Sequence, residues 1–462
     1  MKTGAWYRAS LRDGRGTYFE GKRIDDVEGD PVLGPTVHEV AATYDRFHSP
    51  EPGATSPLMT IARSAEDLKA RIPVLHQADL VANVTYQSIM TLLTAAARIS
   101  DCPKYVERIG AYVDRAQKDD IRIVECITDA KGDRSLPPSK QHDPDLYVRV
   151  VDRSPDGVTI RGAKLHISGA SYAHDLMTIP TKAMKAGEEA YAIAAMVPVN
   201  APGVRIVNTT YAPRHGDARA FPISGRHHMP EGFVIFDDVF VPNERVFLDG
   251  ETRHAAVFAH SLGLWERLGG LSAFVEEADQ LVGFAQLIAE ANGLAGEPHI
   301  REKISEMIIH ATLLRAGLEA ALSNCHLTPE GAAFPDELFT NAAKYYGAAN
   351  YNLVVRHLHD IAGGSVLTAP SVADLENGEV GPLIRKYMST GPDVDGEYRT
   401  RLFHAIRDLT ADALGGWKAV TNLQAGGGLY AQRIVTRRFY DLAGAKRKAL
   451  AHAGIEAPPA KR

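Results

Sequence analysis

Cysteine is scarce in this chain of 462 residues, which contains three: Cys102, Cys126 and Cys325. They lie far apart in the sequence and cannot form the dense disulfide framework of a small secreted domain. None belongs to a CxxC pair, the spacing with which cysteines commonly hold a metal. We therefore expect neither structural disulfides nor a metal site.

An excess of positive charge and long apolar segments are also missing. The 51 Lys and Arg residues are outnumbered by 57 Asp and Glu residues, which gives a formal net charge of −6. Nucleic acid is not expected as a partner, because binding to phosphates requires concentrated Lys and Arg. No uninterrupted apolar run approaches the roughly 18 residues of a membrane-spanning helix, and residues 1–15 lack the apolar core of a signal peptide. We expect a cytoplasmic protein without a membrane partner.

Several familiar catalytic signatures are absent. The sequence contains no GxSxG nucleophile elbow, no HExxH zinc motif and no GxxxxGK[ST] phosphate loop. The spacing GxGxxA does occur from Gly426 to Ala431, but a dinucleotide fingerprint has to follow a strand. Residues 410–423 have a helical pattern, so we exclude a Rossmann domain. His357 and His359 are two positions apart and would point in different directions on a helix, which does not favour a shared metal.

The predicted elements divide the chain into three parts. Residues 55–120 are rich in Ala and Leu with few helix breakers, which predicts helices. Residues 145–248 contain runs of β-branched and aromatic residues, including two strands joined by an Asp-Gly turn. From residue 255 apolar positions recur every three or four residues, as in amphipathic helices. We predict a mainly helical α+β fold, with a helical N-terminal domain (1–142), a β domain (143–250) and a C-terminal helical bundle (251–462).

Two segments about thirty residues apart have the clearest pattern for binding a ligand. Residues 128–134 cluster four charged side chains around a glycine, which can offer donors to a polar ring edge or a pyrophosphate. In residues 161–170, His166 and Ser168 alternate with apolar residues on a predicted strand and are expected on the same face. The alternative interpretations are a solvated turn for the first segment and an exposed strand face for the second.

These segments and several other motifs, in the same order, resemble the family that contains 4-hydroxyphenylacetate 3-monooxygenase and 4-hydroxybutyryl-CoA dehydratase. The resemblance covers nearly the whole chain. Its motifs are Thr-Asp-Ala-Lys-Gly-Asp-Arg (128–134), Asp-Pro-Asp-Leu (143–146), Val-Phe-Val-Pro-Asn-Glu-Arg-Val-Phe-Leu (239–248), Asp-Ile-Ala-Gly-Gly (360–364) and Ala-Gln-Arg-Ile (431–434). The resemblance implies an acyl-CoA-dehydrogenase-like fold with a β-barrel-like middle domain, non-covalently bound FAD and a homotetramer.

The resemblance also implies where FAD binds. Ser168 is expected at the edge of the isoalloxazine ring with His166 just behind it, and the glycine-rich loops are expected near the FAD of the same or a neighbouring subunit. For the loop at Gly426 the alternative is a simple helix–helix turn. The predicted cofactor-binding residues are Thr128, Asp129, Lys131, Gly132, Arg134, His166, Ser168, Gly169, Gly363, Gly364, Gly426 and Gly427.

Three residues are predicted to act on the substrate. Glu231 matches a glutamate that the dehydratase branch places near its active site, and a buried carboxylate beside an aromatic ligand can have a raised pKa and accept a proton. The alternative interpretation is that Glu231 is a capping or surface carboxylate. Glu125 occupies the position of a histidine that binds the phenol in the monooxygenase branch. Tyr86 is retained and could hold a hydroxylated ligand, whereas the arginine of that branch is not.

The chain departs from the dehydratase branch at its metal site. That branch needs a four-iron cluster held by three cysteines and one histidine, because the iron acts as a Lewis acid on the leaving hydroxyl. The resemblance places Leu80, Val84, Leu264 and Leu271 at or near these positions. A second glutamate of the dehydratase site corresponds to Thr421. We therefore expect no iron and no radical dehydration.

The resemblance leads to one main hypothesis and two alternatives. The main hypothesis is a monooxygenase that uses reduced FAD and O2, through a flavin C4a-hydroperoxide, to hydroxylate a small aromatic or heteroaromatic compound. A separate NAD(P)H:flavin reductase would supply the reduced FAD, since the chain has no convincing NAD(P)H site. One alternative is an iron–sulfur-free relative of the dehydratase that acts on an acyl-CoA. The other is a FAD-binding protein without turnover.

Overall fold

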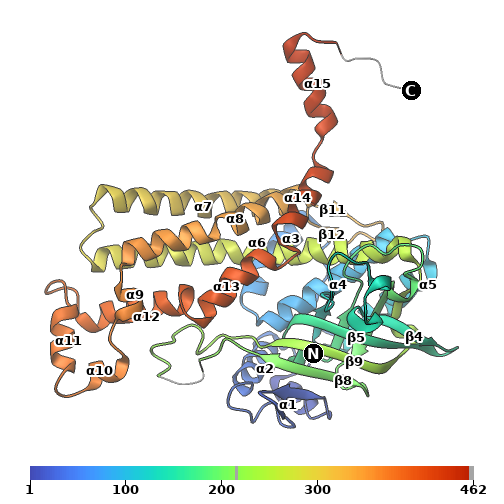
Figure 1. The fold of residues 1–462 in the computed structure, drawn as a ribbon, viewed down its shortest axis with the longest axis horizontal. Helices are drawn as coiled ribbons and strands as arrows, with labels where there is room; N and C mark the ends of the chain where they lie inside the picture. The colour runs from blue at the N-terminus through green and yellow to red at the C-terminus, as the bar shows by residue number, and fades with distance from the viewer. Residues whose placement is uncertain (214–216, 457–462) are drawn as a thin grey trace.

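The chain folds in the order helices, sheets, helices. The computed structural model describes residues 1–213 and 217–456. Helices α1 and α2 lie below the sheets in Figure 1, and a bundle of long helices lies above them. The predicted mainly helical α+β fold is confirmed.

Five helices lie within residues 1–122, all of which are described. They are α1 (Gly4–Ser10), α2 (Gly34–Phe47), α3 (Ala65–His76), α4 (Leu80–Arg98) and α5 (Pro103–Asp119). Helix α4 begins where the Asp79 side chain accepts a hydrogen bond from the backbone N–H of Ala82 at 2.9 Å, because an N-cap satisfies a donor that the helix leaves free. Among the described helices, α4 alone is long and apolar enough to cross a membrane, and 61% of its most apolar window is buried inside the protein.

Two main β-sheets form the middle of the described structure. The larger has the strand order β2-β1-β8-β9-β5-β4, and the smaller has the order β10-β7-β6-β3. The strands are β1 (Thr17–Phe19), β2 (Lys22–Arg23), β3 (Ile123–Cys126), β4 (Arg149–Arg153), β5 (Gly157–Ser168), β6 (Asp175–Thr178), β7 (Ile193–Pro198), β8 (Val204–Thr209), β9 (Glu231–Pro242) and β10 (Val246–Asp249). Buried side chains of both sheets share one apolar core with α1, α2, α4 and α5.

The long strands β5 and β9 position the candidate site. They pair antiparallel from Gly157 opposite Pro242 to Ser168 opposite Glu231. The predicted hairpin is confirmed, because β4 and β5 pair antiparallel around the Asp-Gly turn. The end of the β5–β9 pair that carries Ser168 and Glu231 reaches the C-terminal helices, through a hydrogen bond from Trp417.

The C-terminal part is built on three long helices that lie side by side (Figure 1). They are α6 (Thr252–Ala291), α7 (Pro298–Ser323) and α8 (Glu337–Ala362), and the short strands β11 (His326–Leu327) and β12 (Ala333–Phe334) join α7 to α8. The apolar periodicity of residues 304–321 forms the buried face of α7, which includes Ile304, Leu314 and Leu318. Ile308, which the same periodicity predicted to be buried, is 48% exposed, so the prediction is wrong at that position.

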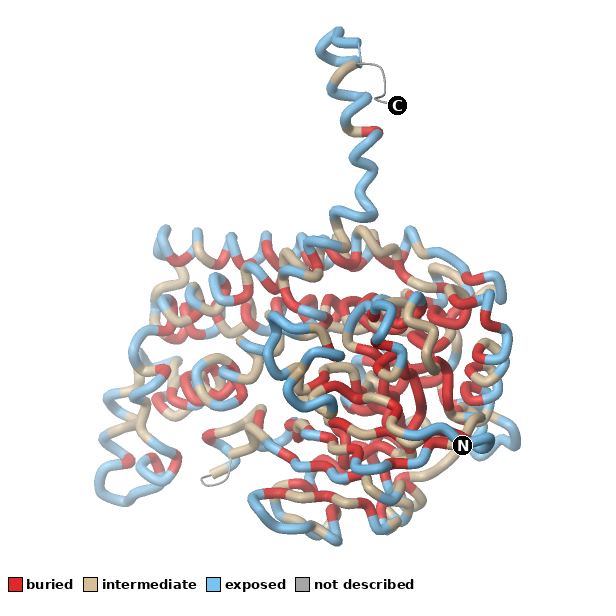
Figure 2. Tube along the Cα trace, turned by 45° about the vertical axis from the view of Figure 1, so that its right-hand side comes forward, coloured by how far each residue is buried: buried red, intermediate tan, exposed pale blue. Residues whose placement is uncertain are grey.

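Smaller helices follow the three long ones. They are α9 (Ser365–Thr368), α10 (Val372–Glu376), α11 (Gly381–Met388), α12 (Gly396–Thr410), α13 (Ala413–Gln424), α14 (Gly428–Phe439) and α15 (Leu442–Ala453). Helix α15 projects from the body (Figure 1), and it is almost entirely exposed (Figure 2). An isolated helix of this length is marginal in water, so α15 lacks the packing that normally stabilises a helix.

The N-terminal part is not purely helical. Strand β1 pairs with β8, and β3 pairs with β6, so residues before 143 contribute to both sheets. Helix α4 contributes Tyr86 and Met90 to a second core formed mainly by the C-terminal helices. The three-part division at residues 142 and 250 therefore stays a prediction. The shared cores extend across its boundaries.

Candidate functional site

Ser168 and Glu231 meet at the end of the β5–β9 pair. The Ser168 hydroxyl donates to the Glu231 carboxylate, with 2.9 Å to each oxygen. Trp417 of α13 donates its indole N–H to Glu231 Oε1 at 3.1 Å. The Tyr211 ring lies against Trp417 with 4.8 Å between the ring centroids. Burial raises the pKa of Glu231, and the hydrogen bonds from Ser168 and Trp417 oppose this rise.

His166 does not share this arrangement. A register shift between Lys164 and Ile167 inserts a β-bulge into β5, and His166 has a positive φ of 61°. The prediction that His166 and Ser168 face the same side by simple alternation is therefore wrong, because the bulge interrupts the two-residue period. His166 is exposed, while Ser168 is half-buried against Glu231. Gly169 follows with φ 72° and donates its N–H to Pro230 O at 2.9 Å.

Residues 128–134 form a turn that is anchored to the sheets. The Thr128 carbonyl accepts from Leu165 N at 2.7 Å, and Lys131 N donates to Leu146 O at 3.1 Å. Lys131 and Gly132 have φ values of 71° and 52°, so the chain reverses there. A Cβ on Gly132 would lie 2.5 Å from Gln141 Oε1, which favours glycine at this position.

Asp129 has a structural role within this turn. Its carboxylate is 2.8 Å from Lys164 Nζ, and both side chains are 2% exposed. The same carboxylate accepts from Val148 N at 2.9 Å and from the Thr181 hydroxyl. Lys164 Nζ also donates to Ile127 O and Ile179 O, at 2.9 Å each. Because the Asp129 carboxylate is fully engaged and its backbone N–H donates to the Thr181 hydroxyl at 3.1 Å, the predicted contact of Asp129 with a cofactor stays a prediction.

The two cations of the turn are differently placed. Arg134 is exposed and forms no hydrogen bond or ion pair with the residues that the structure describes. Lys131 is half-buried, and burial, with the charge of Arg134, lowers its pKa. These two side chains fit an anionic group such as a pyrophosphate, because nothing within the described chain neutralises Arg134.

Glu125 lies on β3, close to a carboxyl group that the motifs did not reveal. Burial and the charge of Glu266, on α6, raise the pKa of Glu125 well above its ordinary value. The Glu125 Oε1 atom is buried and has no hydrogen-bond partner among the described residues. Glu266 was missed, although a charged residue in the apolar stretch of residues 262–268 is a signal that could have found it. Trp417 was missed too, and no sequence signal marks it.

Tyr86 is buried on α4, 3% exposed, with its ring edge-on to Trp265 at 6.0 Å between centroids. Its hydroxyl has no hydrogen-bond partner in residues 1–213 and 217–456. Burial raises the pKa of Tyr86, and the charges that act on it come from Arg71 and Asp67 of α3. Among the described residues no hydrogen bond joins this hydroxyl to Glu125, so the catalytic role of Tyr86 stays a prediction.

The glycine-rich loop before α14 is held by α6. Gly426 and Gly427 have φ values of 75° and 93°. Arg267 Nε donates to Gly426 O at 2.7 Å, and a hydrogen bond from the Gly426 backbone lowers the pKa of Glu266, which burial raises. The helix α13 precedes this loop, which supports the exclusion of a Rossmann domain.

The two predicted glycine pairs do not meet within one chain. Gly363 and Gly364 are exposed at the end of α8, whereas α14 packs near the beginning of α8, beside Ala342 and Tyr345. The 18 helical residues from Tyr345 to Gly363 correspond to about 27 Å. The structure therefore does not bring the two pairs together, and a cofactor site that uses both stays a prediction.

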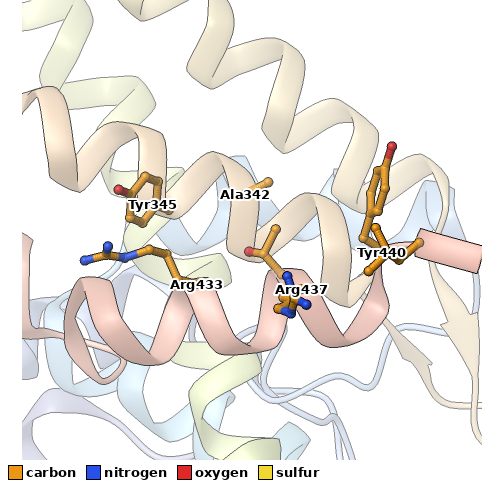
Figure 3. Close-up of a pocket in the computed structure, with 7 residues that line it drawn as sticks. Ala342, Tyr345, Arg433, Arg437 and Tyr440 are labelled. Carbon is orange, nitrogen blue, oxygen red and sulfur yellow. The ribbon is translucent and has the colours of Figure 1, made fainter. Parts of the chain in front are cut away.

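A pocket of about 400 Å³ lies between α8 and α14 (Figure 3). It is lined by Ala342, Tyr345, Arg433, Thr436, Arg437, Tyr440 and Leu442. The Arg433 guanidinium lies over the Tyr345 ring at 5.7 Å. This pocket is separate from the carboxyl groups around Glu231.

Histidines that could suggest a metal are engaged individually. His357 Nε2 lies 2.9 Å from Glu306, and His359 Nε2 lies 2.7 Å from the Thr410 hydroxyl, in agreement with their predicted divergence. A group of possible ligand atoms does occur at Asp101, Cys102 and His254. Arg253 lies 2.7 Å from Asp101 in that group, and its guanidinium already supplies the positive charge that a metal would bring.

Family comparisons agree with the motifs. The family model "4-hydroxyphenylacetate 3-hydroxylase N terminal" matches residues 3–248, and the corresponding C-terminal model matches residues 255–454. The chain belongs to this family. It is 27% identical to 4-hydroxybutyryl-CoA dehydratase/vinylacetyl-CoA-Delta-isomerase of Clostridium aminobutyricum, over 99% of this chain and 100% of that protein. It is also 27% identical to the 4-hydroxyphenylacetate 3-monooxygenase oxygenase component of Thermus thermophilus, over 90% of this chain and 89% of the relative.

Solved structures match the fold over its full length. An archaeal 4-hydroxybutyryl-CoA dehydratase from N. maritimus superposes with a TM-score of 0.90 at 27% identity, covering 100% of this chain and 96% of the other. The oxygenase component of 4-hydroxyphenylacetate 3-monooxygenase complexed with FAD superposes with a TM-score of 0.87 at 25% identity, covering 98% of each chain. The family resemblance drawn from the motifs is confirmed.

Aliphatic residues stand where the resemblance placed the cluster ligands of the dehydratase branch. Leu264 and Leu271 are buried in α6, 1% and 0% exposed. Val84 and Leu80 are on α4, which packs against α6. These side chains have no atom that could ligate iron, so the residues present do not fit the cluster.

Proposed function

We propose that this chain is the oxygenase of a two-component flavin monooxygenase that hydroxylates a small aromatic or heteroaromatic compound. The observation that carries the proposal is the set of four aliphatic residues at the cluster positions, within a family whose members include FADH2-dependent monooxygenases. An oxygenase of this family without iron has to obtain its reactivity from the flavin and O2. Bound reduced FAD would supply the activation of oxygen.

The residues of the chain bind, orient and move protons. Arg134 and Lys131 would hold the pyrophosphate of FAD, and the Ser168 hydroxyl would face the ring edge. Glu231, with a pKa raised by burial, would accept the proton of the substrate. The Trp417 and Tyr211 rings would keep water from this point. A separate NAD(P)H:flavin reductase would deliver the reduced cofactor.

The test is oxygen consumption by the purified protein supplied with chemically reduced FAD and a panel of phenols and heteroaromatic compounds. We expect the protein to bind reduced FAD more tightly than oxidised FAD, and one class of compound to yield a hydroxylated product. Failure to bind reduced FAD would overturn the proposal. The matched control is Glu319→Gln, an exposed carboxylate paired with Lys69.

A second candidate is a dehydratase- or isomerase-like activity on an acyl-CoA. It is favoured by the full-length similarity to the Clostridium aminobutyricum enzyme. Turnover of 4-hydroxybutyryl-CoA or vinylacetyl-CoA without O2 would support it, and iron found by elemental analysis would support the complete dehydratase chemistry. Oxygen-dependent product formation, without acyl-CoA turnover and without iron, would favour the monooxygenase over the acyl-CoA enzyme.

The proposed assembly is a homotetramer. Exposed apolar side chains occur on α7, where Ile309 and Leu313 are 57% and 50% exposed, and on α14, where Tyr430 and Ile434 are 76% and 50% exposed. Each pair is spaced i, i+4 and therefore lies on one helix face. Monomeric proteins seldom expose contiguous apolar surface of this kind, and burial against other copies would also support α15.

A further inference from the structure

Helix α13 carries Trp417 to the site but has little apolar packing of its own. Leu414 and Gly415 are the buried residues of this helix, and Val420 is 62% exposed. Packing of an apolar face supplies most of the stability of a short helix. The position of α13, and with it the hydrogen bond from Trp417 Nε1 to Glu231 Oε1 at 3.1 Å, therefore depends largely on polar contacts.

Lys418 and Asn422 of α13 bind the same carboxylate on α6. Lys418 Nζ lies 3.0 Å from Glu277 Oε1, and Asn422 Nδ2 donates to Glu277 Oε2 at 3.3 Å. Lys418 and Asn422 are spaced i, i+4 and share one face of α13, whereas Trp417, one position before Lys418, lies on another. One face of α13 is thus joined to α6, while a neighbouring face reaches Glu231.

The carboxylate that holds α13 is shielded from water. The Glu277 side chain is 7% exposed, and that of Lys418 is 21% exposed. The Tyr351 hydroxyl of α8 donates to Glu277 Oε1 at 3.1 Å and orients the carboxylate. A shielded ion pair is screened less by salt than an exposed one, and removing one partner leaves the other charge uncompensated. We therefore expect this contact to matter more than the exposed ion pairs of the C-terminal helices.

A contact from α8 acts on the end of α13. Lys344 Nζ donates to Asn422 O at 3.0 Å, and Lys344 is 1% exposed. Asn422 lies two residues before the end of α13, so its carbonyl is one of the four that a helix leaves without an internal partner. A lysine at this end also interacts favourably with the helix dipole. A Cβ on Gly270 would lie 2.6 Å from Lys344 Cε, so glycine at this position of α6 leaves room for the lysine.

These contacts account for the polar side-chain links of α13. Within the part of the chain that the structure describes, Trp417, Lys418 and Asn422 are the residues of α13 whose side chains form hydrogen bonds or ion pairs with another helix or strand. Two of these three links end on Glu277. Without that carboxylate, the hydrogen bond from Trp417 to Glu231 would be the remaining polar side-chain link, and α13 would be free to shift.

We propose that Glu277 is a positioning residue, which holds α13 through Lys418 and Asn422 so that the Trp417 indole stays on the Glu231 carboxylate. The inference rests on the proposed function, in which Glu231 accepts the proton of the substrate. Glu277 would affect the reaction through α13 alone. A displaced Trp417 would leave Glu231 with the hydrogen bond from Ser168 and would let water reach this point.

Fluorine NMR on the full chain labelled with 5-fluorotryptophan follows Trp417 directly. The chain contains three tryptophans, and the signal that is missing from Trp417→Phe identifies Trp417. In the parent protein we expect this signal to change with pH, because Glu231 ionises beside the indole, and we expect the change to vanish in Glu231→Gln. A parent signal that does not respond to Glu231 would overturn the inference without any change at Glu277.

Variants of the ion pair then test its role. In Glu277→Ala and in Lys418→Met, the Trp417 signal should shift and should lose most of its response to Glu231. Lys418→Arg keeps the positive charge and should restore most of that response. The matched control is Lys303→Met, because the Lys303 side chain is 25% exposed and lies 2.6 Å from Asp360, in an ion pair away from α13. This control should leave the Trp417 signal unchanged.

Product formation by the complex with reduced FAD gives a second readout. In Glu277→Ala and Lys418→Met, turnover should fall at least about tenfold, because misplaced groups react slowly, and affinity for reduced FAD should change less than about threefold. The acidic limb of the pH profile should move to higher pH. The hydrogen bond from Trp417 opposes the rise in the pKa of Glu231, whereas burial and the charge of Glu266 raise it in the parent and in the variants alike.

The possible outcomes separate this inference from the proposed function. A Trp417 signal and pH profile that are unchanged in folded Glu277→Ala or Lys418→Met would overturn the inference, as would equal effects of Lys303→Met and Lys418→Met. Lys418 is partly exposed, so Lys418→Met provides the test if Glu277→Ala does not fold. The NMR measurement requires no turnover, so a negative result there leaves the proposed function standing. A parent protein that does not bind reduced FAD defeats the proposed function itself.

Discussion

Two regions of the molecule, the site around Glu231 and the helices α14 and α15, differ in how complete they are within one chain. Around Glu231, strands and helices from three sections of the sequence close on one another, and Ser168 and Trp417 satisfy the carboxylate directly. Around α14 and α15 the opposite holds. Tyr430 is 76% exposed there, α15 projects into solvent, and the pocket with Arg433 and Arg437 opens between two helices (Figures 2 and 3).

This contrast separates two requirements of the proposed reaction. The Ser168 and Glu231 groups that would touch the substrate are held by hydrogen bonds inside a single chain. The glycine pairs at residues 363–364 and 426–427, by contrast, are on separate parts of the chain, and we expect them to act together between copies. We therefore expect changes near the sheets to affect folding and chemistry. Changes on the exposed surfaces of α14 and α15 should affect assembly and retention of the cofactor.

The largest effect is expected from the buried ion pair between Asp129 and Lys164, which anchors the turn of residues 128–134. Asp129→Ala would leave Lys164 charged and buried without its carboxylate, so the free energy of unfolding should fall by about 3–5 kcal/mol. Urea denaturation measures the change. The double variant Asp129→Leu with Lys164→Met should recover much of the loss, since it removes both charges. A stable Asp129→Ala protein with weakened FAD binding would instead make this carboxylate a cofactor ligand.

A change on the exposed face of α14 should affect assembly and cofactor binding. Tyr430→Glu with Ile434→Glu puts two charges on the exposed face of α14, so the assembly should dissociate and the affinity for reduced FAD should fall by about a hundredfold. Light scattering and anaerobic titration are the measurements. The control is Phe240→Glu, an exposed aromatic residue on β9 that is 48% exposed. A monomeric parent protein that binds reduced FAD tightly would contradict the contrast drawn above.

Around Glu231, the sequence predicted the strands better than it predicted the bulge and the side-chain contacts. The alternation of residues 145–168 and the Asp-Gly turn were sufficient for the β4–β5 hairpin, because local pairing determines such an element. The bulge at His166 was not predictable, since it depends on how β5 meets β9 over its whole length. Trp417 contacts Glu231 although the two residues are 186 positions apart in the sequence, and no local pattern encodes such a contact.

The charged turn tests the link between the two regions. Arg134→Ala should weaken reduced FAD by roughly ten- to a hundredfold, because a hydrogen bond to a charged group is worth about 1.5–3 kcal/mol. The folded state should lose less than about 0.5 kcal/mol, since Arg134 is exposed and contacts no described partner. Arg301→Ala, at an exposed position of α7, is the matched control. Unchanged FAD affinity in folded Arg134→Ala would leave residues 128–134 as a solvated turn.

A smaller effect is expected in the pH dependence of stability. With the folded-state pKa of Glu125 raised, the unfolded chain ionises first as pH increases above the ordinary value of 4.5, so stability falls until the folded pKa is passed. This loss is at most about 1.4 kcal/mol per pH unit for each group. Glu125→Gln cannot ionise, so its stability relative to the parent should increase between pH 5 and pH 8. A difference that stays constant over this range would show that Glu125 is not buried as a neutral acid.

The smallest effect on binding is expected at Ser168, inside the closed region. Ser168→Ala removes the donor that lies 2.9 Å from each Glu231 oxygen, while Trp417 still donates to the same carboxylate. A single neutral donor contributes about 0.5–1.5 kcal/mol, and the remaining hydrogen bond limits the loss, so FAD affinity should fall less than about threefold. Proton acceptance should suffer more, because the Glu231 carboxylate is no longer oriented toward the strand. Release of hydrogen peroxide relative to hydroxylated product should therefore rise, and stopped assays with peroxide detection measure the ratio. Cys126→Ser, a buried control on the adjacent β3, should leave that ratio unchanged; if Ser168→Ala behaved in the same way, Ser168 would be a structural link between β5 and β9 with no part in the chemistry.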